Sequence, residues 1–303
     1  MFSVDEIRRF FRGRIALDEP LAKFTWMKVG GRADCYLEPA DKQDLIEIVR
    51  YVRQHDIPFM MLGRGSNVLV SDAGIRGVVI NLEQGLTKIE VASGEVSAEA
   101  GVRITKFVDV CVQNGFAGVE MLAGIPGTVG GGVVMNAGAH GGEIADHLVD
   151  VEIMQGVDVV RVPKAECGFR YRHSKFEGEV VLSARFRLPA GDTETLIQRR
   201  KKLIQLRNAS QPLELPNLGS MFKNPPGNFA ARLIEQAGLK GKQIGNAQIS
   251  EKHANFMVNR GGATAADVMR LIDLVQRTVY QNSGVRLELE VKLVGFQHEE
   301  QAA

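Results

Sequence analysis

Nine of the 25 residues from Gly118 to Gly142 are glycine, and no other feature of the sequence constrains the fold so strongly. Glycine at this density destabilises the interior of a helix or strand by roughly 0.5–1 kcal/mol per residue relative to alanine. The run has no collagen-like period and is interleaved with apolar residues, which argues against a flexible linker. We therefore expect a loop whose backbone amides face an anionic ligand, followed by a helix that begins near Thr128. The alternative is a tightly packed turn without a ligand.

A second glycine-rich segment, Gly63-Arg64-Gly65-Ser66-Asn67, leads directly into the apolar run 68–70. It is not the dinucleotide-binding Gly-x-Gly-x-x-Gly pattern, because Val68 occupies the third glycine position and a strand-like run follows in place of a helix. A Walker A pattern is absent from the sequence as well, since the Gly241-Lys242 pair has no glycine five positions before it. Two phosphate-binding candidates therefore exist, and neither belongs to the two commonest nucleotide folds.

The composition indicates a globular protein of two or three domains. The chain has 303 residues, of which 45% are apolar and 24% charged. A net charge of +1 gives no electrostatic reason to expect a nucleic-acid or membrane partner. We expect no signal peptide and no membrane span, because early acidic residues interrupt the N-terminal segment and no run approaches eighteen apolar residues. No obligate protein partner is indicated.

The cysteines and histidines do not suggest a metal site. Cys35, Cys111 and Cys167 are odd in number, widely spaced and without a CxxC pair, which favours buried thiols in a reducing cytoplasm. The histidines show no ligand spacing, so we expect no bound metal. The Gly-x-Ser-x-Gly elbow of a serine hydrolase is also absent from the sequence.

Hydrophobic periodicity predicts a mixture of helices and strands. Asp41 and the Thr264/Asp267 pair are expected to cap helices, and 18–31 is interpreted as a loop. The expected helices are 4–11, 42–55, 105–114, 192–208, 228–238 and one that begins near Thr264. The expected strands are 33–38, 59–62, 68–70, 89–91, 96–100, 149–154, 157–162, 180–188 and 287–294.

The clearest boundary is Pro189-Ala-Gly-Asp192, after which a long helix carries several arginines and lysines. Such a run usually forms a solvated face, and an anion-binding face is the alternative. The polar, proline-punctuated segment 211–226 follows, and the spacing of Ser220, Lys223 and Asn224 suggests that they face a common point.

Six motifs in sequence order resemble one family, the UDP-N-acetylenolpyruvoylglucosamine reductases, over about residues 24–295. Each motif alone is weak, whereas all six in order are specific. They are Gly63-Arg-Gly-Ser-Asn67, Ala123-Gly-Ile-Pro-Gly-Thr-Val-Gly-Gly131, Asn136-Ala-Gly-Ala139, Tyr171-Arg172 with Ser174, Gly219-Ser-Met-Phe-Lys-Asn-Pro225 and Glu290-Val291.

The resemblance implies an α+β protein with a two-lobed FAD-binding domain of the vanillyl-alcohol oxidase/p-cresol methylhydroxylase type and a C-terminal α+β substrate-binding domain. We assign 1–84 and 85–190 to the two lobes and 191–303 to the substrate-binding domain. Only a few residues separate Ser174 from the strand at 180, so the chain resembles the shorter form of the family, without a tyrosine-bearing insertion. The implied FAD-binding residues are Gly63, Arg64, Gly65, Ser66, Asn67, Gly124, Ile125, Pro126, Gly127, Thr128, Gly130, Gly131, Asn136, Ala137 and Gly138.

The resemblance also implies the chemistry. FAD binds non-covalently, since 60–70 contains no histidine or cysteine, and NADPH is the co-substrate. A UDP-sugar enolpyruvate is reduced to UDP-N-acetylmuramate for peptidoglycan synthesis. Ser220 is the implied proton donor, and Arg172 and Glu290 are the residues that stabilise the enolate-like intermediate. Glu290 suits this role when it is protonated or when it holds a hydrogen-bond donor in place, and the sequence leaves both alternatives open. Weaker candidates for substrate contacts are Arg207, Lys223, Asn224, Lys240 and His253, and His253 is as readily interpreted as a surface or capping histidine.

Two other functions fit parts of the sequence. An FAD oxidase of the same superfamily would share the flavin loops but has no need of Ser220, Lys223, Asn224 and Glu290. A flavin-binding module without turnover would need neither the proton donor nor Arg172.

Overall fold

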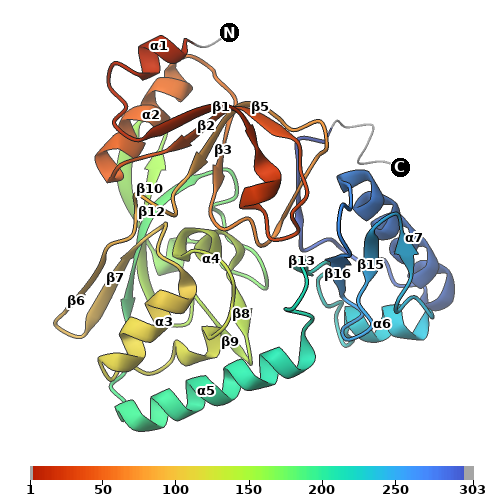
Figure 1. Ribbon diagram of the computed structural model, residues 1–303. Helices are drawn as coiled ribbons and strands as arrows, with labels where there is room; N and C mark the ends of the chain where they lie inside the picture. Colours follow the sequence, from red (N-terminus) through yellow and green to blue (C-terminus); the bar gives the residue numbers. More distant parts are fainter. Residues whose placement is uncertain (1–2, 297–303) are drawn as a thin grey trace. The chain divides into compact units, whose positions relative to one another are not determined.

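The computed structural model describes residues 3–296, and the chain divides into two compact units that are interleaved in sequence (Figure 1). The first unit comprises residues 3–17, Cys35–Arg64 and Gly77–Leu206. The second unit comprises Asp18–Asp34, Gly65–Arg76 and the residues from Arg207 onward. The expected division at residues 84/85 and 190/191 remains a prediction.

The N-terminal sheet has four strands in the order β1-β2-β5-β3. β3 pairs in parallel with β5 and ends directly before the glycine-rich segment 63–67. Helix α2 follows Asp41, whose side chain accepts a hydrogen bond from Asp44 N, as the sequence predicted. The elements of this region are α1 (Val4–Ile7), β1 (Arg14–Pro20), η1 (Leu21–Phe24), β2 (Arg32–Glu38), α2 (Lys42–Gln54), β3 (Phe59–Leu62), β4 (Val68–Val70) and β5 (Ile75–Asn81).

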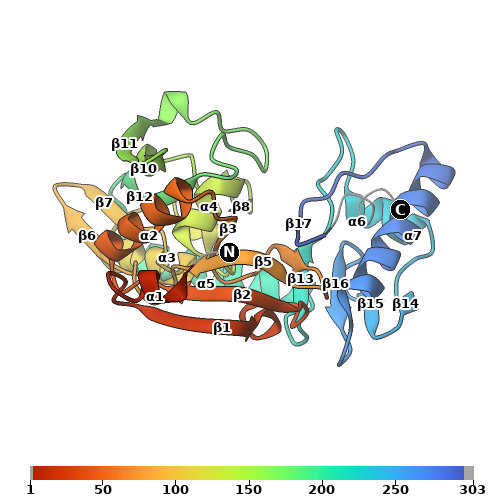
Figure 2. The same cartoon turned by 90° about the horizontal axis from the view of Figure 1, so that it is seen from above.

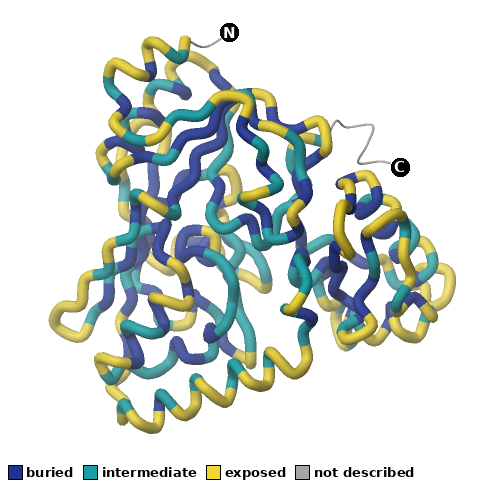
Figure 3. Tube along the Cα trace, in the orientation of Figure 1, coloured by how far each residue is buried: buried dark blue, intermediate teal, exposed yellow. Residues whose placement is uncertain are grey.

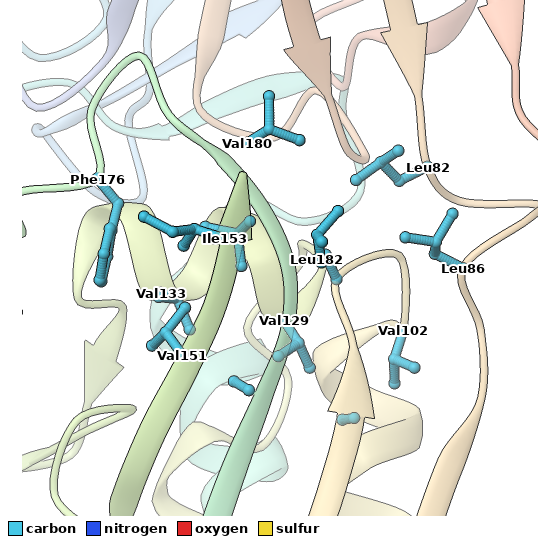
Figure 4. Close-up of a cluster of buried hydrophobic side chains, with 14 of the residues drawn as sticks. Leu82, Leu86, Val102, Val129, Val133, Val151, Ile153, Phe176, Val180 and Leu182 are labelled. Atoms are coloured by element: carbon cyan, nitrogen blue, oxygen red, sulfur yellow. The ribbon is translucent and has the colours of Figure 1, made fainter. Parts of the chain in front are cut away.

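The second sheet is antiparallel, with five strands in the order β11-β10-β12-β7-β6. Helix α4 packs against β12, and Figure 4 shows Val129 and Val133 of this helix beside Val151, Leu182 and Phe176 in the core. These side chains fix α4, and with it the glycine run. The strands and main helices are β6 (Ile89–Ala92), β7 (Glu95–Glu99), α3 (Ile104–Gln113), α4 (Val129–Met135), β10 (Leu148–Gln155), β11 (Asp158–Pro163) and β12 (Val180–Arg187).

Short elements fill the connections of this lobe, and helix α5 follows it. The short elements are η2 (Glu120–Leu122), β8 (Gly138–Ala139), β9 (Gly142–Glu143) and η3 (Lys164–Glu166). Helix α5 (Thr193–Ser210) is exposed along most of its length (Figure 3), and Leu196 is its one buried residue. Its basic residues are not all solvated, because Arg199 lies 2.8 Å from the buried Glu120 carboxylate and Arg200 forms an ion pair with Asp109.

The C-terminal part of the second unit is a four-stranded antiparallel sheet in the order β13-β16-β15-β14, flanked by α6 and α7 (Figure 2). The predicted capping box of Thr264 and Asp267 opens α7, whose buried stripe packs into this core. A separate parallel pair joins β4 to β17. The elements are β13 (Asn217–Ser220), α6 (Ala230–Gln236), β14 (Gln243–Ile244), β15 (Ala247–Ile249), β16 (Phe256–Asn259), α7 (Ala265–Ser283) and β17 (Lys292–Val294).

Four local predictions were wrong. The helix expected over 4–11 ends at Ile7. The strand expected over 287–294 is regular only at Lys292–Val294, because Glu290 N and Val291 N both donate to Met221 O and interrupt the ladder. The segment 18–31 is not wholly a loop, since it contains the end of β1 and the turn η1. Helix α6 begins after Phe229 rather than Asn228, and Asn224 Oδ1 accepts a hydrogen bond from Ala230 N at its start.

Candidate functional site

The two glycine-rich loops touch each other within the first unit. A Cβ on Gly63 would lie 2.7 Å from Thr128 Oγ1, so only glycine permits this approach. Thr128 is 3% exposed and caps α4, where its hydroxyl accepts a hydrogen bond from Gly131 N at 3.4 Å. The helix start predicted at Thr128 is therefore confirmed. Asn81 Nδ2 donates to Gly63 O at 3.1 Å and fixes the other side of the contact.

The three consecutive glycines of α4 differ in their surroundings. Alanine at Gly130 would bring its Cβ within 2.8 Å of Ala100 Cβ, and at Gly132 within 3.0 Å of Ile144. Packing therefore explains these two glycines. Gly131 is exposed, and the nearest atom to its Cβ position, outside its own helix and among the described residues, is Thr128 Oγ1 at 3.6 Å. Packing gives no reason for glycine here, whereas the close approach of a ligand does.

Gly65 has a different explanation, which lies inside the second unit. Its φ is +59°, and a Cβ would stand 2.3 Å from Phe24 O. Its own carbonyl accepts a hydrogen bond from Trp26 N at 3.0 Å. At this position the packed-turn alternative accounts for the glycine without a ligand.

Asn136 ends α4 in the left-handed conformation, with φ of +46°, and is 1% exposed. Its Nδ2 donates to Glu143 Oε2 at 2.7 Å and to Arg170 O at 3.0 Å. Its Oδ1 is buried and accepts no hydrogen bond from residues 3–296. A buried polar atom without a partner is costly, so this oxygen is suited to accept a hydrogen bond from a ligand.

Arg172 is held beside the same helix. Its backbone is left-handed, with φ of +52°, and its Nη2 donates to Gly138 O at 2.8 Å. The guanidinium carbon lies 4.9 Å from the centre of the Tyr171 ring. Ser174 Oγ donates to Val134 O at 2.8 Å and so ties this motif to α4. The sequence motifs at 136–139 and 171–174 are therefore one structural cluster.

Glu83 connects the two loops through arginines. Its Oε1 lies 3.1 Å from Arg64 Nη1 and 2.6 Å from Arg103 Nη2. Arg103 directly precedes α3, and the next amide, Ile104 N, donates to Gly127 O at 3.0 Å. Arg64 therefore has a carboxylate neighbour, which sequence reasoning did not anticipate.

Ser220 and Glu290 come together in the second unit through one shared residue. Met221, the neighbour of half-buried Ser220, accepts a hydrogen bond from Glu290 N at 2.8 Å through its carbonyl. Asn67 Nδ2 donates to Glu290 O at 2.9 Å, and Lys292 N donates to Asn67 O at 3.0 Å. Asn67 of the first glycine-rich loop therefore lies in the second unit together with Ser220 and Glu290. The third predicted catalytic residue, Arg172, belongs to the first unit.

The weaker substrate candidates have local partners. Lys223 Nζ lies 3.5 Å from Glu288 Oε2, and Lys240 Nζ lies 3.1 Å from Glu235 Oε1. Asn224 uses its side-chain oxygen to cap α6. These contacts are weak exposed ion pairs and a helix cap, which leave the lysines available to an anionic substrate.

His253 is a half-buried histidine with a local role. Its Nδ1 accepts a hydrogen bond from Asn255 N at 3.2 Å, and its ring packs on Phe256 with centroids 4.8 Å apart. Burial lowers the pKa of His253, and the charge of Lys240 lowers that pKa further. His253 is therefore neutral at pH 7, and its hydrogen bond supports the capping interpretation.

Arg207 and Gln211, at the C-terminal end of α5, carry unmatched polar atoms. Burial lowers the pKa of Arg207 to about 10, so the side chain remains charged at neutral pH. Among residues 3–296, neither Arg207 Nε nor the buried Gln211 Oε1 has a hydrogen-bond partner. The two residues are one helical turn apart, as the bond from Gln211 N to Arg207 O shows. Sequence reasoning missed Gln211, because a glutamine before a proline carries no motif.

The other predicted cofactor residues are partly exposed. They are Ser66, Asn67, Gly124, Ile125, Pro126, Gly127, Ala137 and Gly138.

All three cysteines are buried, and burial raises the pKa of Cys111 to about 12 and that of Cys167 to about 11. Over the described part of the chain, no helix has the length and apolarity to span a membrane, and no three acidic, histidine or cysteine side chains form a metal-binding group.

Two family models match separate parts of the chain. Residues 33–160 match an FAD binding domain, and residues 211–294 match the C-terminal domain of UDP-N-acetylenolpyruvoylglucosamine reductase. These matches and the observed sheets define an α+β flavoprotein fold, with an FAD-binding domain and a C-terminal domain.

Nearly full-length relatives identify the family. The chain is 44% identical over 305 residues to UDP-N-acetylenolpyruvoylglucosamine reductase of Chloroherpeton thalassium, which covers 98% of both chains. It is 44% identical over 287 residues to the reductase of Streptococcus uberis, covering 93% of this chain and 94% of the relative. The crystal structure of the reductase from Thermus caldophilus superposes with a TM-score of 0.81 at 35% identity, covering 94% of this chain and 100% of that one. The chain belongs to the UDP-N-acetylenolpyruvoylglucosamine reductase family.

Proposed function

We propose that this protein reduces the enolpyruvyl group of UDP-N-acetylglucosamine enolpyruvate to UDP-N-acetylmuramate, with FAD as cofactor and NADPH as hydride donor. The observation that carries the proposal is the link through Met221, whose peptide groups join Ser220 to Glu290 within a chain that also contains an FAD-binding domain. We also propose a cytoplasmic location, since three buried thiols suit a reducing compartment.

The residues of the first unit fit FAD. Gly131 leaves an exposed helix surface that a ligand can approach closely, and its amide lies in the first turn of α4, where the helix dipole favours an anion. Asn136 Oδ1 is a buried acceptor without a protein donor, which suits an N–H or hydroxyl group of the cofactor. Amides of the segments 63–67 and 124–128 would hold the diphosphate, since the amides of 129–131 already donate hydrogen bonds within the protein. When bound, FAD supplies the two-electron hydride chemistry that no side chain can perform.

Ser220 supplies the proton that completes the reduction. NADPH provides a hydride with both electrons, which the vinyl terminus of the substrate receives, and negative charge then develops on the adjacent carbon and its carboxylate. The Ser220 hydroxyl donates its proton to that carbon, so the double bond becomes a saturated CH–CH₃ unit. Proton transfer from a positioned side chain typically contributes 10²–10⁴-fold to a rate.

Arg172 and Glu290 stabilise the charge that develops before protonation. The planar guanidinium of Arg172 can bind both oxygens of a carboxylate, and its bond to Gly138 O fixes the orientation of the fork. Glu290 is fixed through its backbone by Asn67 and Met221. Its carboxyl group stabilises negative charge when it is protonated or when it holds a hydrogen-bond donor in place. Preorganised groups of this kind lower the barrier because they need no rearrangement during the reaction.

Arg207, with Gln211, contributes to binding the UDP part of the substrate. A partly buried guanidinium whose Nε lacks a partner among residues 3–296 is destabilising in the free protein and is neutralised when an anion binds. The neighbouring acceptor Gln211 Oε1 can take a hydrogen bond from the nucleotide. Lys223, Lys240 and Asn224 would add further contacts to the diphosphate or sugar.

The visible spectrum of the purified protein tests this function. We expect a yellow protein that NADPH bleaches without oxygen and that the enolpyruvyl substrate restores, with UDP-N-acetylmuramate as product. An FAD oxidase would instead be bleached by an alcohol or hydroxy acid, regain its colour with O₂, and ignore the enolpyruvyl compound. A protein that takes up no FAD would contradict the proposal.

A further inference from the structure

Strand β13 contains a β-bulge immediately before Ser220. Asn217 pairs with Val258 and Ser220 with Phe256, so two residues, Leu218 and Gly219, stand opposite a single one. Because side chains alternate along a strand, the extra residue moves Ser220 to the face that regular pairing would give to its predecessor. Gly219 has φ of +70°, while its Cβ position is 3.7 Å from the nearest atom, so the conformation and not the space requires glycine.

The side chain of Asn217 closes this bulge. Its Oδ1 accepts a hydrogen bond from Gly219 N at 3.0 Å, the amide that the bulge removes from the ladder. Its Nδ2 donates to Leu215 O at 2.9 Å and to Pro212 O at 3.3 Å. The side chain is 2% exposed, so these bonds are made away from water and hold the segment before Ser220 firmly.

Asn255 fixes the chain on the other side of Ser220. Its Oδ1 accepts from Phe222 N at 3.0 Å, and its Nδ2 donates to Phe222 O at 2.8 Å. Its backbone carbonyl accepts from Met221 N at 2.9 Å. The buried side-chain amide of Asn255 thus bonds both backbone polar groups of Phe222, in place of a neighbouring strand. The backbone of Asn255 also binds Met221, whose carbonyl accepts the hydrogen bond from Glu290 N.

We propose that Asn217 and Asn255 are positioning residues that lock the bulge and set the direction of the Ser220 hydroxyl for proton transfer. The inference rests on the proposed role of Ser220 as proton donor. A proton donor must come within about 2.6–3.2 Å of its acceptor, and a displacement of about 1 Å can reduce a rate 10²-fold.

The first test uses the FAD-loaded full chain and follows its two half-reactions separately. Asn255→Ala should leave bleaching by NADPH within about twofold of the native rate and slow the substrate-driven return of colour by roughly 10–100-fold. The matched control is Asn259→Ala. Asn259 is buried in the same sheet, and its side chain bonds Met27 O, Gly261 N and Ala263 N, which all lie outside 219–222. The control should lower the midpoint of thermal unfolding as much but slow neither half-reaction.

Two further readouts separate positioning from general stability. A protonated carboxyl group has the same donor and acceptor as the amide, so Asn255→Asp should regain the rate of colour return, relative to the native protein, as the pH is lowered. Independently of turnover, hydrogen exchange at Gly219 N should accelerate in Asn217→Ala, and exchange at Phe222 N should accelerate in Asn255→Ala. Both amides should stay protected in Asn259→Ala.

The outcomes distinguish this inference from the proposed function. If Ser220→Ala slows the return of colour but Asn255→Ala behaves like Asn259→Ala, the positioning role is wrong and the proton donor stands. Equal slowing of both half-reactions in Asn255→Ala, or no pH recovery in Asn255→Asp, would likewise overturn the positioning role. A native return of colour in Ser220→Ala would remove the proton donor itself, and the positioning role with it.

Discussion

Gly63 and Thr128 bring the two glycine-rich loops into contact, because a Cβ on Gly63 would lie 2.7 Å from the Thr128 hydroxyl. We predict that Gly63→Ala displaces this hydroxyl from its capping position, destabilises the protein by about 1–2 kcal/mol and lowers FAD occupancy. Denaturant unfolding and the flavin-to-protein ratio measure the two effects. Gly63→Ala combined with Thr128→Gly should recover much of both, since glycine at an N-cap costs only a few tenths of a kcal/mol relative to threonine. An unchanged single variant would show that the loops do not need this contact.

The exposed glycine of α4 gives a second prediction, in which stability and cofactor binding move in opposite directions. Gly131→Ala should stabilise the FAD-free protein by about 0.5–1 kcal/mol, because alanine favours a helix, and should weaken FAD binding. Gly130→Ala should instead destabilise it by about 1–3 kcal/mol through overpacking against Ala100. Thermal unfolding without FAD and titration with FAD separate these effects. Full FAD affinity in Gly131→Ala would mean that the helix surface is not the cofactor surface.

The third prediction concerns the half-reactions of the Ser220→Ala variant. Bleaching by NADPH requires no proton donor at a substrate carbon, so its rate should be close to native. The return of colour with substrate should slow by at least about a hundredfold, with substrate binding little changed. Stopped-flow absorbance measures both rates. Equal slowing of the two would point to a packing defect instead.

Arg207 gives a prediction that couples stability to binding. Arg207→Gln should leave the free protein as stable as the native form or more stable, because it removes a partly buried charge whose Nε has no partner among residues 3–296. The same change should weaken substrate binding roughly tenfold or more, the usual effect of losing a charged hydrogen bond. Calorimetric titration with UDP and thermal unfolding provide the measurements. Lower stability together with native affinity would show that the side chain is structural.

His253 gives a prediction about pH. Since burial lowers its folded pKa below the ordinary 6.5, the unfolded chain binds more protons than the folded chain in this range. The stability that neutral His253 contributes is therefore present above pH 6.5 and is lost as pH falls through the folded pKa. His253→Asn keeps an acceptor for Asn255 N but does not titrate, so its unfolding free energy should fall less between pH 7 and pH 5.

The elements with strong local signals were predicted well from the sequence. Asp41, Thr128 and the Thr264/Asp267 capping box all mark helix starts as expected, because a cap and an apolar stripe act within a few residues. The short strands β14 and β15 carried no usable signal, since two or three residues cannot display an alternating pattern.

The sequence motifs named the candidate site residues but not the contacts that hold them in place. Ser220 and Glu290 stand in motifs that the sequence displays, and the structure places both beside Met221. The amide of Asn255 acts on a residue 33 positions away, and the bulge that it helps to hold depends on pairing with β16. The local sequence pattern does not predict this hydrogen bond, because tertiary contacts bring the two residues together.

The union of β4 with β17 constrains the order in which this protein can assemble during synthesis. Asn67 and Glu290 are 223 positions apart, yet the side chain of one binds the backbone of the other. Met27, Val29 and Leu69 pack in a core that is formed mainly by residues beyond 207. Their apolar surface therefore stays exposed while the polypeptide leaves the ribosome, until those later residues have been synthesised. Ribosome-bound chains that stop before Lys292 would expose these early segments, and chaperones that recognise apolar stretches would find them there.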